Sequence, residues 1–184
     1  MKSPLCFVVE PANGRLYDNV RENGLIVSAS KEDHTTTARF ATVISTPIGY
    51  NGPIQEGDSV MVHHNTFRKY FNMKGKEVYG PAHFRDNTFL VEDVYMYKHD
   101  GKFYCPAPYC MVRPIKNENA DDIKTTNALL LQVGELVYGN EELRALGVND
   151  GDIVGFTQDA EYEFRVNDEI LYRMFTRNIY GVKK

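Results

Sequence analysis

Cysteine is scarce in this sequence, and long hydrophobic runs are absent. The three cysteines, Cys6, Cys105 and Cys110, are odd in number and stand mostly among apolar residues. This argues against a disulfide framework and indicates reduced thiols. No run of about 18 uncharged apolar residues occurs, so we expect no transmembrane helix. Residues 1–4 are polar and end in a proline, unlike a signal peptide. Together these features predict a cytoplasmic protein.

The sequence also lacks an excess of basic residues. It has 21 Lys and Arg against 25 Asp and Glu, which gives a net charge of -4. A protein whose main partner is nucleic acid needs a basic face, so this class is disfavoured. The locally basic stretch 68–76 contains Tyr70 and Phe71, which could stack on bases. We interpret it instead as a solvated hairpin with aromatic anchors.

Recognisable metal sites and catalytic motifs are missing as well. A zinc site needs about four close ligands, and Cys105 and Cys110 have no neighbouring histidine pair. We expect His63 and His64 to lie on a strand with their rings on opposite faces, where they could not chelate one metal. No Ser-His-Asp order, glycine-rich phosphate loop or HExxH sequence stands out. The sequence therefore predicts a protein that is not an enzyme and uses neither cofactor nor metal.

Short strand patterns dominate what is present. Charged and apolar residues alternate over 161–166, which predicts a half-buried antiparallel strand with Tyr162, Phe164 and Val166 facing the core. A turn then leads into another β-rich run at 169–175, so we expect a hairpin.

Only one segment has a convincing helical pattern. Asn140 can cap its start, Leu143 and Leu146 would share a face, and Gly147 suits a left-handed stop. The segment spans little more than one turn. Many short strands with almost no helix predict an all-β fold, either barrels or sandwiches.

An internal repeat organises the chain. Three landmarks occur twice in the same order: an apolar strand ending in Pro, a Gly-Asp turn entering an apolar strand, and a closing apolar-Tyr step. Three matches in order indicate a duplication. A cluster of turn residues and prolines near 99–108 marks the boundary, so we expect domains at 1–104 and 105–184. The repeated segments are 9–11 with 112–114, 57–60 with 151–154, and 94–95 with 179–180.

The first copy is the longer one. Pro11 precedes Gly57 by 46 positions, whereas Pro114 precedes Gly151 by 37. Insertions concentrate in exposed loops. The polar stretch at about 20–37 is the candidate for the extra residues.

These landmarks resemble those of the GroES co-chaperonin family, in which an opening strand, a mobile loop with a Gly-Ile-Val-Leu type motif, a Gly-Asp-x-Val turn and a closing hairpin follow one another. In the second copy, residues 146–180 look like the family's turn and hairpin. In the first copy, Gly24, Leu25, Ile26 and Val27 are similar to the loop motif. The resemblance implies an all-β chain of two tandem GroES-like β-barrel modules with very little helix.

The resemblance also implies a function. The chain would be a co-chaperonin that forms a homo-oligomeric ring, caps a GroEL-type chaperonin through residues 24–27 of a mobile loop at about 20–37, and assists ATP-dependent folding. The second module lacks a clear mobile loop, because 116–127 is polar and Leu129 to Leu131 lack a preceding glycine and are interpreted as strand. The architecture resembles the double-module co-chaperonins of plastids, and the divergence suits a phage-encoded version.

Other interpretations stay open. Leu25 to Val27 could be a short core strand, and the chain could be a non-catalytic structural or adaptor protein, for example of a virion, built from tandem β-barrels. Alcohol dehydrogenases also contain a GroES-like domain, but this sequence has no Gly-x-Gly-x-x-Gly segment or cysteine and histidine zinc set.

Overall fold

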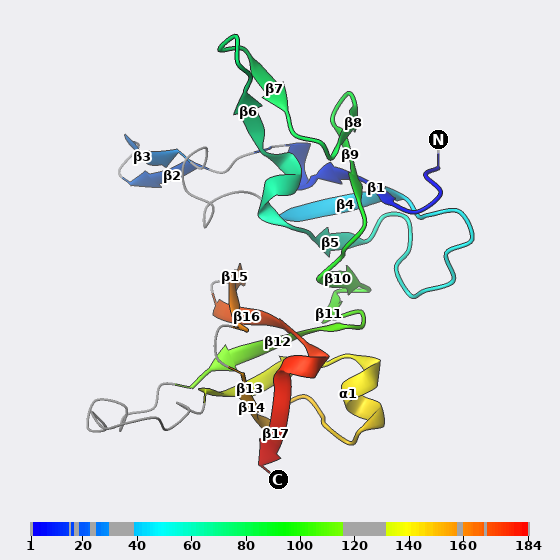
Figure 1. The fold of residues 1–184 in the computed structure, drawn as a ribbon, viewed down its shortest axis with the longest axis vertical. Coiled ribbons are helices and arrows are strands. Elements are labelled where there is room, and N and C mark those ends of the chain that lie inside the picture. Colours follow the sequence, from blue (N-terminus) through cyan, green and yellow to red (C-terminus); the bar gives the residue numbers. More distant parts are fainter. Residues whose placement is uncertain are drawn as a thin grey trace. The chain divides into compact units, whose positions relative to one another are not determined.

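β-Strands are the main regular structure of the protein. The computed structural model describes residues 2–14, 16, 19–22, 25–29, 39–115, 132–157, 160–167 and 169–183 (Figure 1). Over this part of the chain it is mostly β, as expected, with a single α-helix of five residues. Two compact units form, Met1–Phe103 and Tyr104–Lys184. This division lies one residue before the boundary expected between 104 and 105.

The first unit is built on a seven-stranded sheet with the order β11-β10-β5-β4-β1-β9-β8. Its pairs from β10 to β8 are antiparallel. Val9, Ala41, Val43, Val60 and Phe89 form the centre of its core, and none is more than 1% exposed. The strands are β1 (Phe7–Pro11), β4 (Phe40–Ser45), β5 (Ser59–Met61), β8 (His83–Arg85), β9 (Thr88–Val91), β10 (Met96–His99) and β11 (Lys102–Tyr104).

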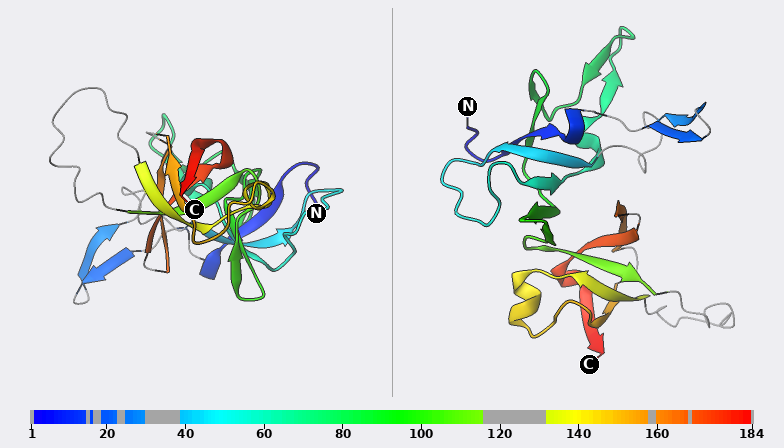
Figure 2. Two further views of the ribbon diagram at one scale, coloured as in Figure 1. Left: turned by 90° about the horizontal axis from the view of Figure 1, so that it is seen from below. Right: turned by 180° about the vertical axis from the view of Figure 1, so that it is seen from behind.

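Two hairpins of the first unit form two-stranded sheets of their own. Figure 2 shows both apart from the seven-stranded sheet. They are inserted in the connections that follow β1 and β5. Their strands are β2 (Asn19–Glu22) with β3 (Leu25–Ala29), and β6 (Lys69–Phe71) with β7 (Glu77–Tyr79); the short 3-10 helices η1 (Ala12–Gly14) and η2 (His64–Phe67) precede them.

The second unit is built on a six-stranded antiparallel sheet with the order β15-β16-β12-β13-β14-β17. Cys110, Val112, Leu136, Val154 and Met174 are fully buried in its core. The elements are β12 (Tyr109–Pro114), β13 (Gln132–Tyr138), α1 (Glu141–Ala145), β14 (Ile153–Phe156), β15 (Tyr162–Val166), β16 (Glu169–Phe175), η3 (Thr176–Asn178) and β17 (Ile179–Lys183).

Six strands of the two sheets have the same arrangement. Numbered along each unit, leaving aside β11 and the two inserted hairpins, both sheets have the order fourth, fifth, first, second, third, sixth. In both sheets the pairing of the first strand with the second contains a register shift. It lies between Val8 and Val9 in β1 and between Met111 and Val112 in β12. Val9 and Val112 are therefore equivalent positions, as the repeat predicts.

The Gly-Asp landmark forms the same turn in both units. Gly57 and Gly151 both have a φ of +95°, a conformation that favours glycine. The Gly57 amide donates to the Val43 carbonyl at 2.8 Å, and the Gly151 amide donates to the Leu136 carbonyl at 2.7 Å. The two glycines thus stand on equivalent elements, which supports a duplicated sheet.

The side chain of the aspartate completes each turn. Oδ2 of Asp58 accepts the amide of Gln55 at 2.8 Å, and Oδ2 of Asp152 accepts the amide of Asn149 at 2.9 Å. Glycine supplies the backbone conformation and aspartate supplies the acceptor, so the dipeptide is required in both copies.

The helical segment follows its capping signals but ends early. The side chain of Asn140 accepts the amide of Leu143 at 3.0 Å, and Gly147 has a φ of +77°. Leu143 is buried, but the expectation that Leu146 shares its core-facing side is wrong, because Leu146 is 74% exposed. The helix ends at Ala145, so no second turn exists to carry Leu146 toward the core.

One face of the hairpin β15–β16 is buried. This confirms the prediction for two of the three residues that were expected to face the core. Phe164 and Val166 are buried. Tyr162 is only partly buried, because it lies at the start of an edge strand, opposite Arg173, whose guanidinium lies 5.1 Å from its ring centroid. The end of β15 nearest the turn is therefore better packed than its start.

His63 and His64 do not lie on a strand. His63 caps η2 and its Nδ1 accepts the amide of Asn65 at 3.1 Å, while His64 is the first residue of the 3-10 helix. Their ring centroids are 4.2 Å apart, so the expected placement on opposite faces is wrong. The chain turns into η2 directly after β5, and the alternation of a strand does not apply there.

All three cysteines are free thiols. Cys105 and Cys110 are buried, and burial raises the pKa of Cys110 to about 12. In the described ranges, no helix has both the length and the apolar character needed to cross a membrane.

Removing the Phe164 side chain should destabilise the second unit. The ring is fully buried, so Phe164→Ala is expected to cost about 3–5 kcal/mol in the free energy of unfolding, measured by urea denaturation. Ile170 in the same hairpin is 41% exposed, and Ile170→Ala should change that free energy by less than about 1 kcal/mol. A loss below about 1 kcal/mol for Phe164→Ala would contradict the packing described above.

A second expectation concerns Asp58 and His99. Oδ1 of Asp58 accepts a hydrogen bond from Nδ1 of His99 at 2.8 Å, and this bond raises the pKa of His99. Stability from a raised pKa is fully present below the unfolded value of about 6.5 and is lost as pH rises through the folded value.

We therefore expect wild type to melt at a higher temperature than His99→Gln near pH 6, and the difference to shrink as pH rises through the raised pKa of folded His99. Circular dichroism melts across this range measure the difference. A difference that does not change with pH would show that the charge on His99 is irrelevant to stability.

Candidate functional site

The β2–β3 hairpin carries the segment that the sequence singles out. Its strands pair antiparallel, with Glu22 opposite Leu25 and Arg21 opposite Ile26, so the chain reverses direction between Glu22 and Leu25. In the described part of the chain neither strand joins the seven-stranded sheet. The hairpin is therefore an addition to the sheet and not one of its strands.

The structure places three of the four expected contact residues on one strand. Leu25, Ile26 and Val27 are the first three residues of β3. Gly24 lies outside the described residues, as does the part of the expected loop at 30–37. Residues 25–27 do form part of a strand, but β3 pairs with β2 and is not one of the strands of the seven-stranded sheet.

The connection that holds this hairpin is longer than its counterpart in the second unit. Pro11 in β1 pairs with Ala41 in β4, 30 positions later, whereas Pro114 in β12 pairs with Gly134 in β13, 20 positions later. The extra length of the first copy thus lies between the first and second strands. Leu129 to Leu131, which belong to the shorter connection, lie outside the described residues.

Both ends of the longer connection are anchored next to each other. Because Pro11 pairs with Ala41, the chain leaves and re-enters the sheet at the same edge. Arg39, just before β4, is 8% exposed and its carbonyl accepts the amide of Val62 at 2.8 Å. The segment between these points can vary in length without changing the register of the sheet.

A second feature, which the sequence analysis missed, is a cavity of about 460 Å³ in the first unit. Pro81, Ala82 and Leu90 supply apolar lining, and Glu92 and Asp93 supply carboxylates. Its remaining lining residues are Cys6, His63, Thr66, Val91 and Tyr95.

The cavity brings together residues that are far apart in sequence, so no local sequence pattern could predict it. The Cys6 thiol lies 4.0 Å from Oε1 of Glu92. Among the described residues, no three His, Cys, Asp or Glu side chains are grouped as a metal site. The lining is suited to an apolar ligand that carries positive charge.

No protein-family model matches this sequence, and no curated protein matches it either.

Proposed function

We propose that this protein is a co-chaperonin that caps a GroEL-type chaperonin and assists ATP-dependent protein folding, with Gly24, Leu25, Ile26 and Val27 as the contact segment. The observation that carries the proposal is the β2–β3 hairpin. It stands outside the main sheet, in a connection ten positions longer than its counterpart, and it contains the apolar motif. An apolar segment outside the main sheet is the kind of segment that a partner can bind.

The repeated sheet supports the accompanying proposal that the chain consists of two tandem GroES-like β-barrel modules. The two sheets share their strand order and the shift in their first strands. In both, a Gly-Asp turn directly precedes the third strand and is hydrogen-bonded to the second, and this turn is part of the sequence resemblance. Only the first module is proposed to bind the chaperonin.

The energetics favour a ring of several copies. Burying three aliphatic side chains contributes at most about 1.5–3 kcal/mol each. Association itself costs about 4–15 kcal/mol in lost translational and rotational freedom. One contact segment alone should bind weakly. Several segments on one homo-oligomer act at high effective concentration and can bind tightly but reversibly.

The proposal is tested by changing the three aliphatic residues together. The variant Leu25→Ser, Ile26→Ser, Val27→Ser should keep the melting temperature of wild type, because β3 is not a strand of the seven-stranded sheet. Its ATP-dependent association with a GroEL-type chaperonin should weaken by more than about 100-fold. Co-sedimentation with the chaperonin in the presence of ATP measures the association.

A matched control removes three exposed aliphatic residues elsewhere. Leu5, Ile48 and Leu146 are 80%, 64% and 74% exposed, and their triple serine variant should bind like wild type. If the residue 25–27 variant unfolds, the segment belongs to the core. If it folds and binds normally, the contact lies elsewhere, with Leu129 to Leu131 as the next segment to change. Failure of wild type to bind any chaperonin favours the adaptor role.

A further inference from the structure

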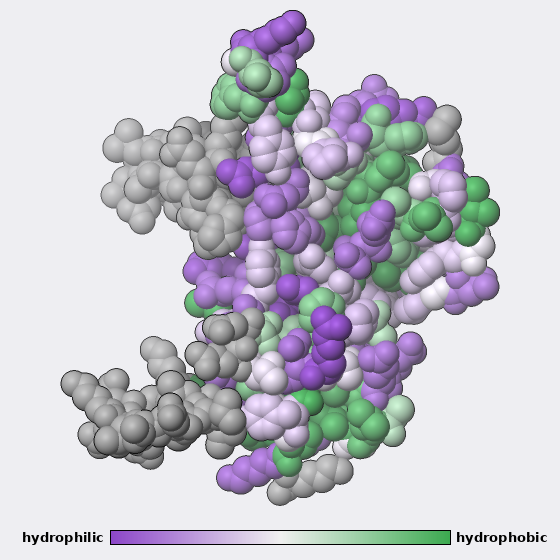
Figure 3. All heavy atoms as spheres, viewed as in Figure 1, coloured by the Kyte–Doolittle hydropathy of each residue, from purple (hydrophilic) through white to green (hydrophobic). Residues whose placement is uncertain are grey.

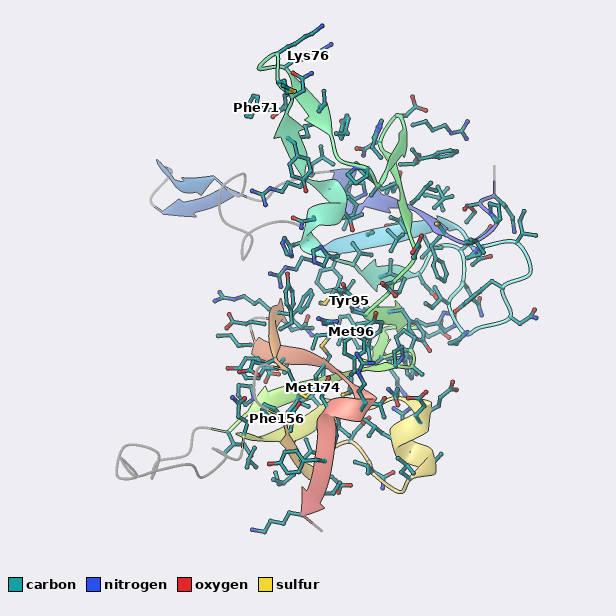
Figure 4. The ribbon with its side chains drawn as sticks, in the orientation of Figure 1. Phe71, Lys76, Tyr95, Met96, Phe156 and Met174 are labelled. Carbon is teal, nitrogen blue, oxygen red and sulfur yellow. The ribbon has the colours of Figure 1, made fainter. Side chains whose placement is uncertain are left out.

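The β6–β7 hairpin presents apolar side chains to solvent at its outer end. Phe71 is 72% exposed and Met73 is fully exposed. Figure 4 shows Phe71 and Lys76 at the end of the hairpin that projects from the first unit, and Figure 3 shows hydrophobic and hydrophilic residues side by side there. Large apolar groups gathered on one projection mark an interaction surface.

This hairpin tip, residues 71–76, is held in one conformation by its own hydrogen bonds. Oδ1 of Asn72 accepts the amides of Lys74 and Lys76, both at 3.0 Å, and the Asn72 amide donates to the Lys76 carbonyl at 3.0 Å. Further down, Nζ of Lys69 lies 3.5 Å from the Glu77 carboxylate. A tip ordered in advance loses little conformational entropy when it docks.

The sheet does not need this hairpin. In the first unit 21 residues separate β5, which ends at Met61, from β8, which begins at His83. In the second unit five residues separate β14, which ends at Phe156, from β15, which begins at Tyr162. Since the same strand order forms with the short connection, the sheet does not require the hairpin or its exposed apolar residues.

Charge indicates which partner. Residues 68–80 contain Arg68, Lys69, Lys74 and Lys76 against Glu77, a net charge of +3. The whole chain has a net charge of -4, so the remainder of the chain has -7. The hairpin is thus complementary in charge to the rest of another copy of the same chain.

The first unit also contains a surface that fits the hairpin tip. The cavity of about 460 Å³ has apolar lining from Pro81, Ala82 and Leu90, which matches the apolar side chains of the tip, and its size is in the range that holds a drug-sized ligand. Its exposed carboxylates, Glu92 and Asp93, match the lysines of the tip.

We propose that the hairpin tip of one copy docks into this cavity of a second copy, with Phe71 and Met73 in the apolar part and Lys74 and Lys76 facing Glu92 and Asp93. Tip and cavity are different surfaces, so the contact repeats from copy to copy and can close into a ring. The closure into a ring rests on the proposed function, whereas the contact itself does not.

Charge reversal tests the contact. Lys74→Glu with Lys76→Glu should weaken self-association by more than about tenfold, and so should Glu92→Lys with Asp93→Lys. The quadruple variant that combines both pairs should regain it, which a merely structural effect would not produce. Sedimentation velocity of the purified chain over a concentration series measures association, and melting temperatures check that each variant folds. Absence of rescue, or unchanged association in both double variants, overturns the proposal.

A second pair of variants tests the apolar part. Phe71→Ser with Met73→Ser should weaken self-association to a similar extent, whereas Leu146→Ser with Ile170→Ser, two exposed residues of the second unit, should not. If wild type is monomeric at all concentrations but sediments with phosphatidylserine vesicles, the hairpin is a membrane-binding element and the proposal is wrong. Binding of single-stranded oligonucleotide by the monomer would overturn it in the same way.

The failure of this proposal can be told apart from failure of the proposed function. The serine variant of residues 25–27 should self-associate like wild type and lose chaperonin binding. If wild type self-associates through the hairpin but does not bind chaperonin, the docking proposal stands and the co-chaperonin proposal is wrong. If the hairpin variants remain fully assembled and bind chaperonin, only the docking proposal is wrong.

Discussion

Each sheet depends on the same kind of turn, in which a glycine and an aspartate have different roles. The glycine at φ +95° donates its amide to the second strand of the sheet, at Val43 in one unit and at Leu136 in the other. The amides of these two strand residues in turn donate to the carbonyls of Asp58 and Asp152, both at 2.9 Å. This pair of hydrogen bonds sets the second strand against the start of the third, and the register of the buried residues follows from it.

What differs between the units lies in the connections, not in the strands. The entropy cost of closing a loop rises slowly with its length, so ten added positions before β4 or sixteen added residues before β8 change the stability of the sheet little. Such insertions are where a duplicated module can acquire contacts with partners. Both inserted hairpins belong to the first unit, which makes it the part of the chain that carries the proposed interactions.

The sequence predicts features that local chemistry determines. The Gly-Asp turn is recognisable because glycine and an acceptor side chain are both required, and the helix start is recognisable because Asn140 caps the amide of Leu143. The alternation of β15 identifies Phe164 as core. Leu146 was not predictable in this way, because its exposure depends on where a short helix ends.

Features without a recognisable local pattern, and features that join distant segments, escape sequence analysis. The pairing of β2 with β3 was not expected, since its residues are composed like a loop, and the placement of His63 and His64 is decided by η2. The cavity joins residues from four separate stretches of the chain, so only the fold brings them together. The contact motif proposed at residues 24–27 was identified only through its resemblance to a known family.

The burial of two of the three thiols makes Cys6 a specific site for labelling. Cys105 and Cys110 are buried, and burial raises the pKa of both thiols, so they are poor nucleophiles toward alkylating reagents. Cys6 is partly exposed and lines the cavity. A maleimide fluorophore would therefore attach there without any engineered cysteine, and its emission would respond directly to whatever enters the cavity.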